Sequence, residues 1–413
     1  MRDKDLYSQI LGIKPPWYVD DVKLDIDANK VEIFITPQAD AVLICPHCHQ
    51  PSPGYDKRER RWRHLDTCQM QTVLVADIPR VDCATHGVTT ITVPWAEPGS
   101  GYTAMFESLV IDWLKVTTTK ALRLRLGLSW NAVDGIMQRA VTRGLARRQA
   151  VSPTRLSVDE TSFQKRHEYV TVVTDQDSAR VVYVADDRKQ ETLESYYKTL
   201  TPEQLAAIES VSMDMWPAYI GATMAQVPEA ISKIAFDKFH VAKYLGDAVD
   251  KVRRTEHRLL QASGCDVMKG SKYDWLSNPE NMDRTRWQGL QNLIALCQKT
   301  ARAWAIKECA MTLWHYVSRT WAEKAWKHWL GWALRSRLKP VRKAAKTIQR
   351  HLYGIINAIV LKANNGIAES INAKIQKVKA MACGFRNRDR FRRAIYFHLG
   401  GLDLYPRIAI PCA

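Results

Sequence analysis

Three acidic residues stand in sequence contexts that suit metal-dependent chemistry on phosphodiesters. Asp159 follows an apolar strand entry in Leu156-Ser-Val-Asp-Glu160, and Asp214 lies at a strand-to-helix transition in Val211-Ser-Met-Asp-Met-Trp216. Glu369 lies early in a predicted helix. Carboxylates are hard oxygen ligands for Mg²⁺ or Mn²⁺. Two such ions roughly 4 Å apart can activate the attacking oxygen and stabilise the leaving oxygen in an in-line phosphoryl displacement.

The helix around Glu369 carries a second indication of a site. A polar stripe at helical spacing runs through Asn365, Glu369, Asn372 and Gln376, and an apolar stripe occupies Ile367, Ile371, Ile375 and Val378. Glu369 therefore belongs to a face of uncharged polar groups. An exposed helix with a single acid explains the same pattern. Rival acids also lie on or near the predicted sheet, namely Glu160, Asp175, Asp177, Asp186, Asp187 and Asp237.

Two short knuckles predict a zinc site. Cys45-Pro-His-Cys48 and Cys83-Ala-Thr-His86 each place two soft ligands at their ends, and the strand-like sequence between them allows the knuckles to meet. Zinc binds four nitrogen or sulfur ligands in a tetrahedron, so Cys45, Cys48, Cys83 and His86 form a closed, structural site. His47 and His49 are rival ligands, and a chance pairing of structural cysteines is the alternative. The other cysteines follow no pattern, which indicates reduced thiols.

The segment from Thr117 to Val141 predicts a helix-turn-helix. Thr117 to Leu126 has the pattern of a helix, Gly127 breaks it, and Ser129 is a good N-cap for a second helix. This second helix carries polar side chains suited to base edges, and basic residues follow it. A plain helical hairpin gives the same pattern. The predicted DNA contacts are Asn131, Gln138, Arg139, Arg143, Arg147 and Arg148.

The basic character of the chain points to a polyanionic partner. The formal net charge is +17, and nucleic acid is the usual partner of so basic a protein. Between the knuckles, Lys57-Arg-Glu-Arg-Arg-Trp-Arg-His64 interleaves cations with one tryptophan, which suits phosphate contacts by Arg58, Arg60, Arg61 and Arg63; a solvated loop is the alternative. Residues 335–350 hold seven cations and no acid, and we expect Arg342 and Lys343 to contact the DNA backbone.

The order of elements predicts a multidomain α+β protein. Residues 1–100, with short strands and turns, form the predicted zinc-binding domain, and residues 101–150 form the helix-turn-helix domain. Residues 151–240 alternate β-branched runs with helices, which predicts a mixed α/β sheet. Residues 241–350 lack strand signals and carry tryptophans at helical spacing, a feature typical of core packing. Residues 351–413 are predicted to complete the sheet domain and to add C-terminal helices.

The chain resembles bacterial insertion-sequence transposases of the DDE class, the group with an N-terminal zinc finger and a helix-turn-helix. The matching segments follow one another along nearly the whole sequence: Cys45-Pro-His-Cys48, Gly54-Tyr-Asp-Lys-Arg58, Arg61-Trp-Arg-His-Leu65, Val93-Pro-Trp95, Ser157-Val-Asp-Glu160, Met213-Asp-Met-Trp216, Phe236-Asp-Lys-Phe-His-Val241 and Asn365-Gly-Ile-Ala-Glu-Ser-Ile-Asn372. His86 departs from the pattern, because the family commonly has a fourth cysteine there.

The resemblance implies a ribonuclease-H-like α/β catalytic fold with a long all-helical insertion between the second and third acids. It assigns Asp159, Asp214 and Glu369 as ligands of catalytic Mg²⁺ or Mn²⁺. Asp237 and His240 also match the family. His240 either approaches a phosphate or the metal site, or the pair orders the turn from strand to helix.

We therefore expect a DNA transposase that binds the terminal inverted repeats of an insertion sequence, cleaves DNA with metal-activated water and joins the freed 3′-hydroxyl to target DNA. Joining two ends favours a homodimer. No apolar run approaches the roughly 20 residues of a membrane span and no signal peptide is evident, so we expect a cytoplasmic, nucleoid-associated bacterial protein. The alternatives are a DNA-binding regulator or inactive derivative with the same front end, and a ribonuclease-H-like nuclease that cleaves without joining.

Overall fold

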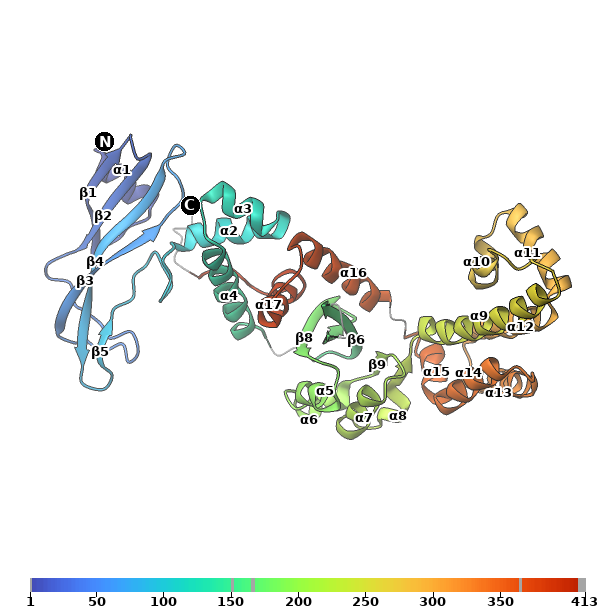
Figure 1. The fold of residues 1–413 in the computed structure, drawn as a ribbon. Helices are drawn as coiled ribbons and strands as arrows, with labels where there is room; N and C mark the ends of the chain where they lie inside the picture. The colour runs from blue at the N-terminus through green and yellow to red at the C-terminus, as the bar shows by residue number, and fades with distance from the viewer. Residues whose placement is uncertain (1, 150–151, 165–167, 364–365, 408–413) are drawn as a thin grey trace. The chain divides into compact units, whose positions relative to one another are not determined.

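The computed structural model describes residues 2–149, 152–164, 168–363 and 366–407. The chain forms two compact units (Figure 1). The first unit comprises Met1–Gln149 together with the segment that begins at Leu402, and the second comprises Ala150–Gly401. The described residues that follow Gly401, Leu402 to Arg407, belong to the first unit.

The first unit is built on a five-stranded sheet. After the short helix α1 (Asp3–Ile10) come β1 (Trp17–Asp25), β2 (Lys30–Pro37), β3 (Gly54–Arg63), β4 (Gln71–Cys83) and β5 (Gly87–Thr90). The strand order is β1-β2-β4-β3, and β5 pairs with the far end of β4. Alternating apolar residues give the sheet one buried face, where Ile33, Leu74 and Ile78 pack with Trp62 and Trp95.

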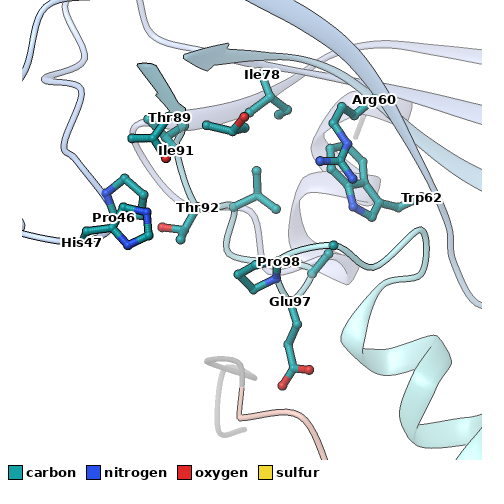
Figure 2. Close-up of a pocket in the computed structure, with 14 residues that line it drawn as sticks. Pro46, His47, Arg60, Trp62, Ile78, Thr89, Ile91, Thr92, Glu97 and Pro98 are labelled. Carbon is teal, nitrogen blue, oxygen red and sulfur yellow. The ribbon is translucent and has the colours of Figure 1, made fainter. Parts of the chain in front are cut away.

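A cavity of about 480 Å³ opens beside β3 in this unit (Figure 2). Its wall includes His47 from the first knuckle, Arg60 and Trp62 from β3, and the connection from Thr89 to Gly99. The Arg60 guanidinium lies 5.6 Å from the centre of the Trp62 ring. The acid in the wall, Glu97, is already paired with Arg143. The cavity therefore offers no set of free acids for catalysis.

Three helices follow the sheet, namely α2 (Ala104–Val116), α3 (Thr119–Leu126) and α4 (Trp130–Ala146). The predicted break is present, because Gly127 ends α3 in the left-handed conformation with φ 64°. The Ser129 hydroxyl then caps α4 by accepting the Ala132 N–H at 3.1 Å. The two helices form the predicted helix-turn-helix geometry.

A C-terminal strap, which we define as Leu402–Arg407, packs against these helices within the first unit. Leu404 is buried, and a Cβ added to Gly144 of α4 would lie 2.7 Å from the Cβ of Leu402. The Tyr405 hydroxyl bonds with Lys115 at 2.6 Å, and Arg147 donates to the Tyr405 carbonyl at 2.6 Å. The strap is therefore an integral part of the first unit.

The second unit contains a mixed five-stranded sheet. Its strands are β6 (Arg155–Gln164), β7 (Glu168–Asp175), β8 (Arg180–Asp186), β9 (Ser210–Met213) and β10 (Ile234–Phe236), in the order β10-β9-β6-β7-β8. β6, β7 and β8 form an antiparallel meander, whereas β9 and β10 run parallel to β6. The runs that predicted strands in this region therefore form one sheet.

Helices cover both faces of this sheet. On one face, α5 (Gln190–Tyr197), α6 (Pro202–Ala207), α7 (Pro217–Gln226) and α8 (Ala230–Lys233) connect the strands, and Leu193, Tyr197 and Tyr219 pack with Val158 and Val173. On the other face lie α16 (Gly366–Met381) and α17 (Arg388–Leu399), whose Ile371, Ile375 and Phe391 pack against Val172 and Phe163. α16 thus lies directly over β6.

The region from residue 238 to residue 360 is helical in the structure, as the lack of strand signals predicted. It comprises α9 (Lys238–Ala262), α10 (Lys272–Leu276), α11 (Arg284–Leu296), α12 (Gln298–Thr312), α13 (Arg319–Arg335), α14 (Lys339–Arg350) and α15 (Leu352–Val360), with short 3₁₀ turns at Pro279–Asn281 and Leu313–His315. Trp326 and Trp329 are fully buried, which confirms core packing for this part of the tryptophan stripe, whereas Trp321 is 60% exposed.

The helical region packs against the sheet through α15. Gly354 of α15 meets Phe236 of β10 so closely that an added Cβ would lie 2.4 Å from the ring. Asn357, one turn later, is buried and donates to the carbonyls of Ile231 and Ile234 at 2.8 Å each. No helix of the described chain is long and apolar enough to cross a membrane.

Candidate functional site

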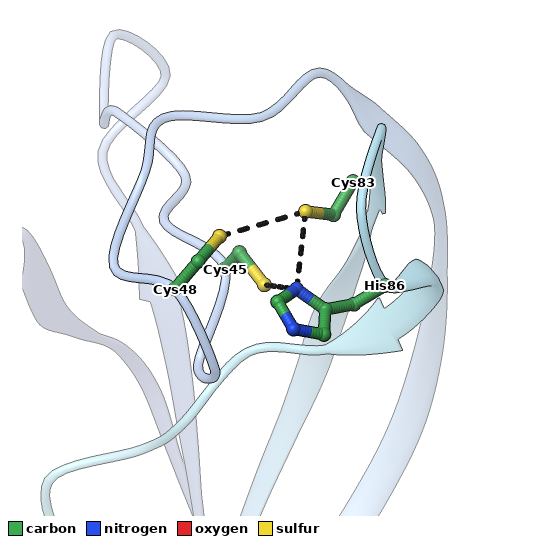
Figure 3. A group of neighbouring side chains, drawn as sticks. All are labelled: Cys45, Cys48, Cys83 and His86. Atoms are coloured by element: carbon green, nitrogen blue, oxygen red, sulfur yellow. Dashed lines mark hydrogen bonds between the residues drawn. The ribbon is translucent and has the colours of Figure 1, made fainter.

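The four predicted zinc ligands meet at one end of the first sheet (Figure 3). Their ligand atoms all lie within 4.8 Å of one another. The Sγ atoms of Cys48 and Cys83 are 3.6 Å apart, and His86 Nδ1 lies 3.7 Å from Cys45 Sγ and 3.6 Å from Cys83 Sγ. A tetrahedral zinc ion with Zn–S near 2.3 Å and Zn–N near 2.0 Å requires ligand separations of about 3.6–3.8 Å. The observed spacing therefore fits zinc.

Local structure favours the same ligand set. The turn after Cys45 closes when the His49 N–H donates to the Cys45 carbonyl at 3.0 Å, and Cys83 ends β4 just before the second turn. Hydrogen bonding to His86 lowers the pKa of the Cys83 thiol to about 6, which favours the thiolate that binds metal. His47 and His49, the rival ligands, lie outside the described group of four.

Asp159 and Asp214 lie at the same edge of the second sheet. β6 and β9 are parallel and pair Ser157 with Ser212, so the positions two residues further on, Asp159 and Asp214, follow the same register. Neighbouring strands are about 4.8 Å apart, which brings the two carboxylates together. β9 and β10 end here, whereas β6 continues to Gln164, so Asp159 lies within β6 beside the carboxyl end of β9, where open α/β sheets place their ligands.

Burial strongly affects these two acids. It raises the pKa of Asp159 to about 6, against the opposing effects of the Glu160 N–H and the positive charge of His240. Burial also raises the pKa of Asp214, again with His240 acting in the opposite direction. Two half-buried carboxylates whose ionised forms are disfavoured would be stabilised by a bound cation. The donor set consists of hard oxygens, as Mg²⁺ and Mn²⁺ require.

Two residues of the predicted polar stripe of α16 contact β6. The Asn372 amide donates to Asp159 Oδ2 at 2.7 Å, and one turn later the Gln376 amide donates to Thr161 Oγ1 at 2.9 Å. Glu369 lies one turn before Asn372 and is exposed. Across the described residues, Glu369 does not gather with Asp159 and Asp214 within ligand distance. Asn365, the first residue of the predicted stripe, lies outside the described residues.

The rival acids have other partners. Asp177 pairs with Arg155 at the opposite end of β6, and the Asp175 side chain accepts the Asp177 N–H. The others are engaged as follows: Asp186 pairs with Arg392, Asp187 accepts the Lys189 N–H and the Thr192 hydroxyl, and Glu160 pairs with Arg188. Asp159 and Asp214 form no ion pair in the described chain, a property that they share with Asp175 and Asp237.

Asp237 and His240 lie beside the two acids. Phe236 pairs with Met213, so Asp237 and Asp214 follow their strands at neighbouring positions. The buried Asp237 caps α9 by accepting the Phe239 N–H at 3.1 Å, which supports a role in ordering the turn. His240, in the first turn of α9, lies near enough for its charge to act on both Asp159 and Asp214.

Residues beyond the predicted set also belong to this edge. Arg188 forms an ion pair with Glu160, and its guanidinium lies over the rings of Tyr169 and Trp216. The Trp216 backbone N–H donates to Asp214 Oδ1 at 3.0 Å. Trp216 was within a segment singled out in the sequence, but Arg188 stands in an ordinary polar turn and carries no signal of its own.

The predicted DNA contacts on β3 divide into two groups. Arg58 is exposed and Arg60 half-buried, and in the described chain neither forms an ion pair. Arg61 is exposed but pairs with Glu32 and Glu59. Arg63 is different, because its side chain is only 11% exposed, pairs with Asp66 and lies 5.2 Å from the Phe106 ring centre. Arg63 therefore joins the sheet to α2 in this structure, and its DNA contact stays a prediction.

The predicted DNA contacts on and just after helix α4 also divide into exposed residues and residues that pair inside the protein. Asn131 and Gln138 are exposed, and Arg148 is half-buried. Arg143 is 8% exposed and pairs with the buried Glu107 of α2 at 2.7 Å, and Arg139 donates to the same carboxylate at 2.8 Å. Arg147 is committed to the strap. In this structure these guanidinium groups neutralise interior acids or bind the strap, and the DNA contacts of Arg139, Arg143 and Arg147 stay predictions.

Helix α14 presents an almost purely basic surface. It buries Val341, Ala344, Ala345 and Ile348, and exposes Lys339, Arg342, Lys343, Lys346 and Arg350 on the other side. In the described part of the chain, none of these five cations forms an ion pair. A row of unpaired cations on one helix face suits a phosphate backbone.

Comparison with known families agrees with this arrangement. The model for the DDE domain of ISL3 transposases, described as "Transposase", matches residues 156–395. A model described as "zinc-finger of transposase IS204/IS1001/IS1096/IS1165" matches residues 42–86, and one described as "Helix-turn-helix domain of transposase family ISL3" matches residues 91–141. These matches confirm the predicted zinc finger and helix-turn-helix.

Similar proteins match along most of the sequence. The transposase for insertion sequence element IS1557 of Mycobacterium tuberculosis is 29% identical, and the alignment covers 94% of this chain and 93% of that protein. The transposase for insertion sequence element IS1001 of Bordetella parapertussis is 27% identical, over 87% of this chain and 89% of that protein. The chain belongs to the ISL3 family of insertion-sequence transposases.

Proposed function

We propose that this protein cleaves DNA at the ends of an insertion sequence and joins those ends to target DNA. The observation that carries the proposal is the half-buried pair of Asp159, within β6, and Asp214, directly after the parallel strand β9, with the Asn372 amide of α16 donating to Asp159. A mixed sheet with helices on both faces supports a ribonuclease-H-like catalytic fold.

Asp159, Asp214 and Glu369 would hold Mg²⁺ or Mn²⁺, and movement of the first turn of α16 would bring Glu369 to the pair. The metal would supply charge for activating the attacking water, and later the 3′-hydroxyl, and for stabilising the leaving oxygen. Asn372 orients the Asp159 carboxylate through its amide. His240, close to both acids, would contribute positive charge toward a DNA phosphate, and Asp237 would fix the turn that carries it.

The first unit would bind the terminal inverted repeats. Helix α4 would enter the major groove with Asn131 and Gln138, and Arg58, Arg60, Arg61 and Arg148 would contact the backbone. The basic face of α14, with Arg342 and Lys343, would follow DNA in the second unit. Synapsis of two ends would require a homodimer.

The direct test replaces Asp214 by Asn in the full chain. We expect the Asp214→Asn variant to fold and to bind end DNA as the wild type does, and to lose at least about 100-fold in Mg²⁺-dependent cleavage, since a metal ligand is removed. Asp177→Asn, at the opposite end of the same sheet, is the matched control and should cleave normally.

Product analysis on labelled end DNA separates the alternatives. Joined products are expected from the wild type only if the protein is a transposase. Cleaved but unjoined ends would indicate a nuclease. End binding without cleavage by the wild type would indicate a DNA-binding regulator, and unchanged cleavage by Asp214→Asn would contradict the metal-ligand assignment.

A further inference from the structure

Arg188 occupies an unusual position beside the carboxylates. It follows β8, and its guanidinium lies over two aromatic rings, 4.4 Å from the centre of Trp216 and 4.7 Å from the centre of Tyr169. Contact with two ring faces restricts the orientation of a planar cation. The side chain is still 35% exposed, so solvent or a ligand reaches it from the remaining direction.

The backbone that carries Arg188 is firmly held. Asp187 has φ 60°, and its carbonyl accepts the Thr171 hydroxyl at 2.6 Å. The Asp187 N–H donates to the Tyr169 carbonyl at 3.0 Å. The Arg188 carbonyl accepts the indole N–H of Trp216 at 3.1 Å. The same tryptophan therefore fixes both the backbone and the side chain of Arg188.

The hydrogen bonds of the guanidinium leave one edge free. Nη1 donates to both carboxylate oxygens of Glu160, at 3.1 Å each. Within the described chain, Nε and Nη2 have no hydrogen-bonding partner and are not buried. The Nε–Nη2 edge is a planar fork of two parallel N–H groups, the geometry that matches two oxygens of a phosphate.

This free edge lies beside the catalytic acids. Glu160, the partner of Nη1, follows Asp159 in β6. Trp216, the stacking partner, donates its backbone N–H to Asp214 Oδ1 at 3.0 Å. The acids at this edge carry negative charge, and so does DNA. A fixed cation at the same place reduces the repulsion that an approaching backbone would meet.

We propose that Arg188 binds a phosphate of the DNA backbone next to the scissile bond through its Nε and Nη2 groups. This inference rests on the proposed function, because it assigns a substrate contact at that site. Glu160, Tyr169 and Trp216 are then positioning residues that fix the orientation of the guanidinium. A half-exposed ion pair contributes little to folding, so stability alone gives a weak reason for such an enclosed arginine.

The test combines protein variants with modified DNA, using the full chain. Arg188→Gln and Arg188→Lys are compared with Arg155→Gln, a matched control whose arginine pairs with Asp177 at the far end of β6. End DNA carries a single neutral methylphosphonate at each position around the cleavage site in turn. One modification should slow the wild type by about 100-fold, the size expected for one lost charge-stabilising donor.

Arg188→Gln should be slowed about as much on unmodified DNA, and the same modification should slow it no further. Arg188→Lys keeps the charge but lacks the fork, so its rate should be intermediate. Arg155→Gln should behave as the wild type. Two results would overturn the inference. One is that every methylphosphonate position slows the wild type and Arg188→Gln by the same factor. The other is that Arg188→Gln cleaves unmodified DNA at the rate of the wild type.

Salt dependence gives a second measurement that does not need cleavage. Loss of one phosphate contact makes the dependence of log affinity on log salt concentration shallower, reducing the magnitude of its slope by about 1. We expect this decrease for Arg188→Gln on end DNA and no change for Arg155→Gln. Identical slopes would overturn the phosphate contact. If Arg188→Gln reduces the salt slope but the wild type does not cleave DNA, the phosphate contact would stand and the proposed cleavage activity would be rejected.

Discussion

His64 shows how one side chain joins two parts of the first unit. It lies just beyond β3, is only 5% exposed, and its Nδ1 is 2.9 Å from the hydroxyl of Thr103. Thr103 caps α2 by accepting the Phe106 N–H, so its hydroxyl proton is available to donate to a neutral imidazole. Burial, with a smaller effect of the Arg63 charge, lowers the pKa of His64 to about 4.

This pKa predicts acid sensitivity. Above pH 6.5 His64 is neutral in both the folded and unfolded states, and the full stability is present. Between pH 6.5 and about 4 only the unfolded state gains the proton, so stability falls by up to about 3 kcal/mol. We expect the difference in melting temperature between pH 7 and pH 4.5 to be smaller for His64→Gln than for the wild type. If the melting temperatures of both proteins fall equally with pH, groups other than His64 cause the loss of stability.

Residue roles in the helix-turn-helix depended on contacts that the sequence does not reveal. The pattern of α4 predicted a basic DNA-reading helix, and Asn131 and Gln138 are indeed exposed. Arg139 and Arg143 turn inward because Glu107, in another helix, is almost fully buried and needs neutralisation. An arginine pattern alone cannot distinguish a phosphate contact from an interior ion pair.

At the scale of elements, the docking of α15 on β10 holds the helical region to the sheet of the second unit. The contact requires a residue without a side chain, because a Cβ at Gly354 would lie 2.4 Å from the Phe236 ring. Phe236 immediately precedes Asp237 and the α9 turn that carries His240. Displacement of α15 would therefore disturb the same edge of the sheet that holds the acids.

We expect Gly354→Ala to lower the free energy of unfolding by about 1–3 kcal/mol, since overpacking forces the ring or the helix to move. Gly289→Ala is the matched control, because Gly289 lies in α11 with nothing within 4 Å of an added Cβ. That change should stabilise the protein by about 0.5–1 kcal/mol through helix propensity. Urea unfolding of both variants measures the difference; equal shifts would contradict the close packing.

The sequence predicted the elements better than their contacts. β-branched runs predicted β7 and β8, and spacing in the Glu369 helix predicted a polar stripe, but its contact with β6 became apparent only in the structure. Spacing within a segment carries this information. The approach of Gly354 to Phe236 and the enclosure of Arg188 arise between residues far apart in the chain, so no local pattern indicates them.

At the scale of the molecule, the strap means that the chain enters the second unit once and returns to the first. Leu404 anchors this return, with 2% of its surface exposed. Leu404→Ala should destabilise the first unit by about 2–5 kcal/mol, as expected for a buried leucine. Arg407→Ala is the control, because its side chain is 74% exposed and its ion pair with Asp403 should contribute little.

The measurement is the urea concentration at which the full chain loses binding to end DNA. We expect that midpoint to fall for Leu404→Ala and to remain within error for Arg407→Ala. Equal midpoints for Leu404→Ala and the wild type would show that the strap adds no stability to the helix-turn-helix.

The strap also imposes an order on synthesis. A ribosome makes the zinc-binding sheet and the three helices first, but the residues that cover Gly144 and bond to Lys115 emerge only after the whole second unit. A nascent or prematurely terminated chain therefore carries a first unit whose three helices still lack the contacts of the strap. Full packing of that unit is reached only after the chain has passed through the sheet that holds Asp159 and Asp214.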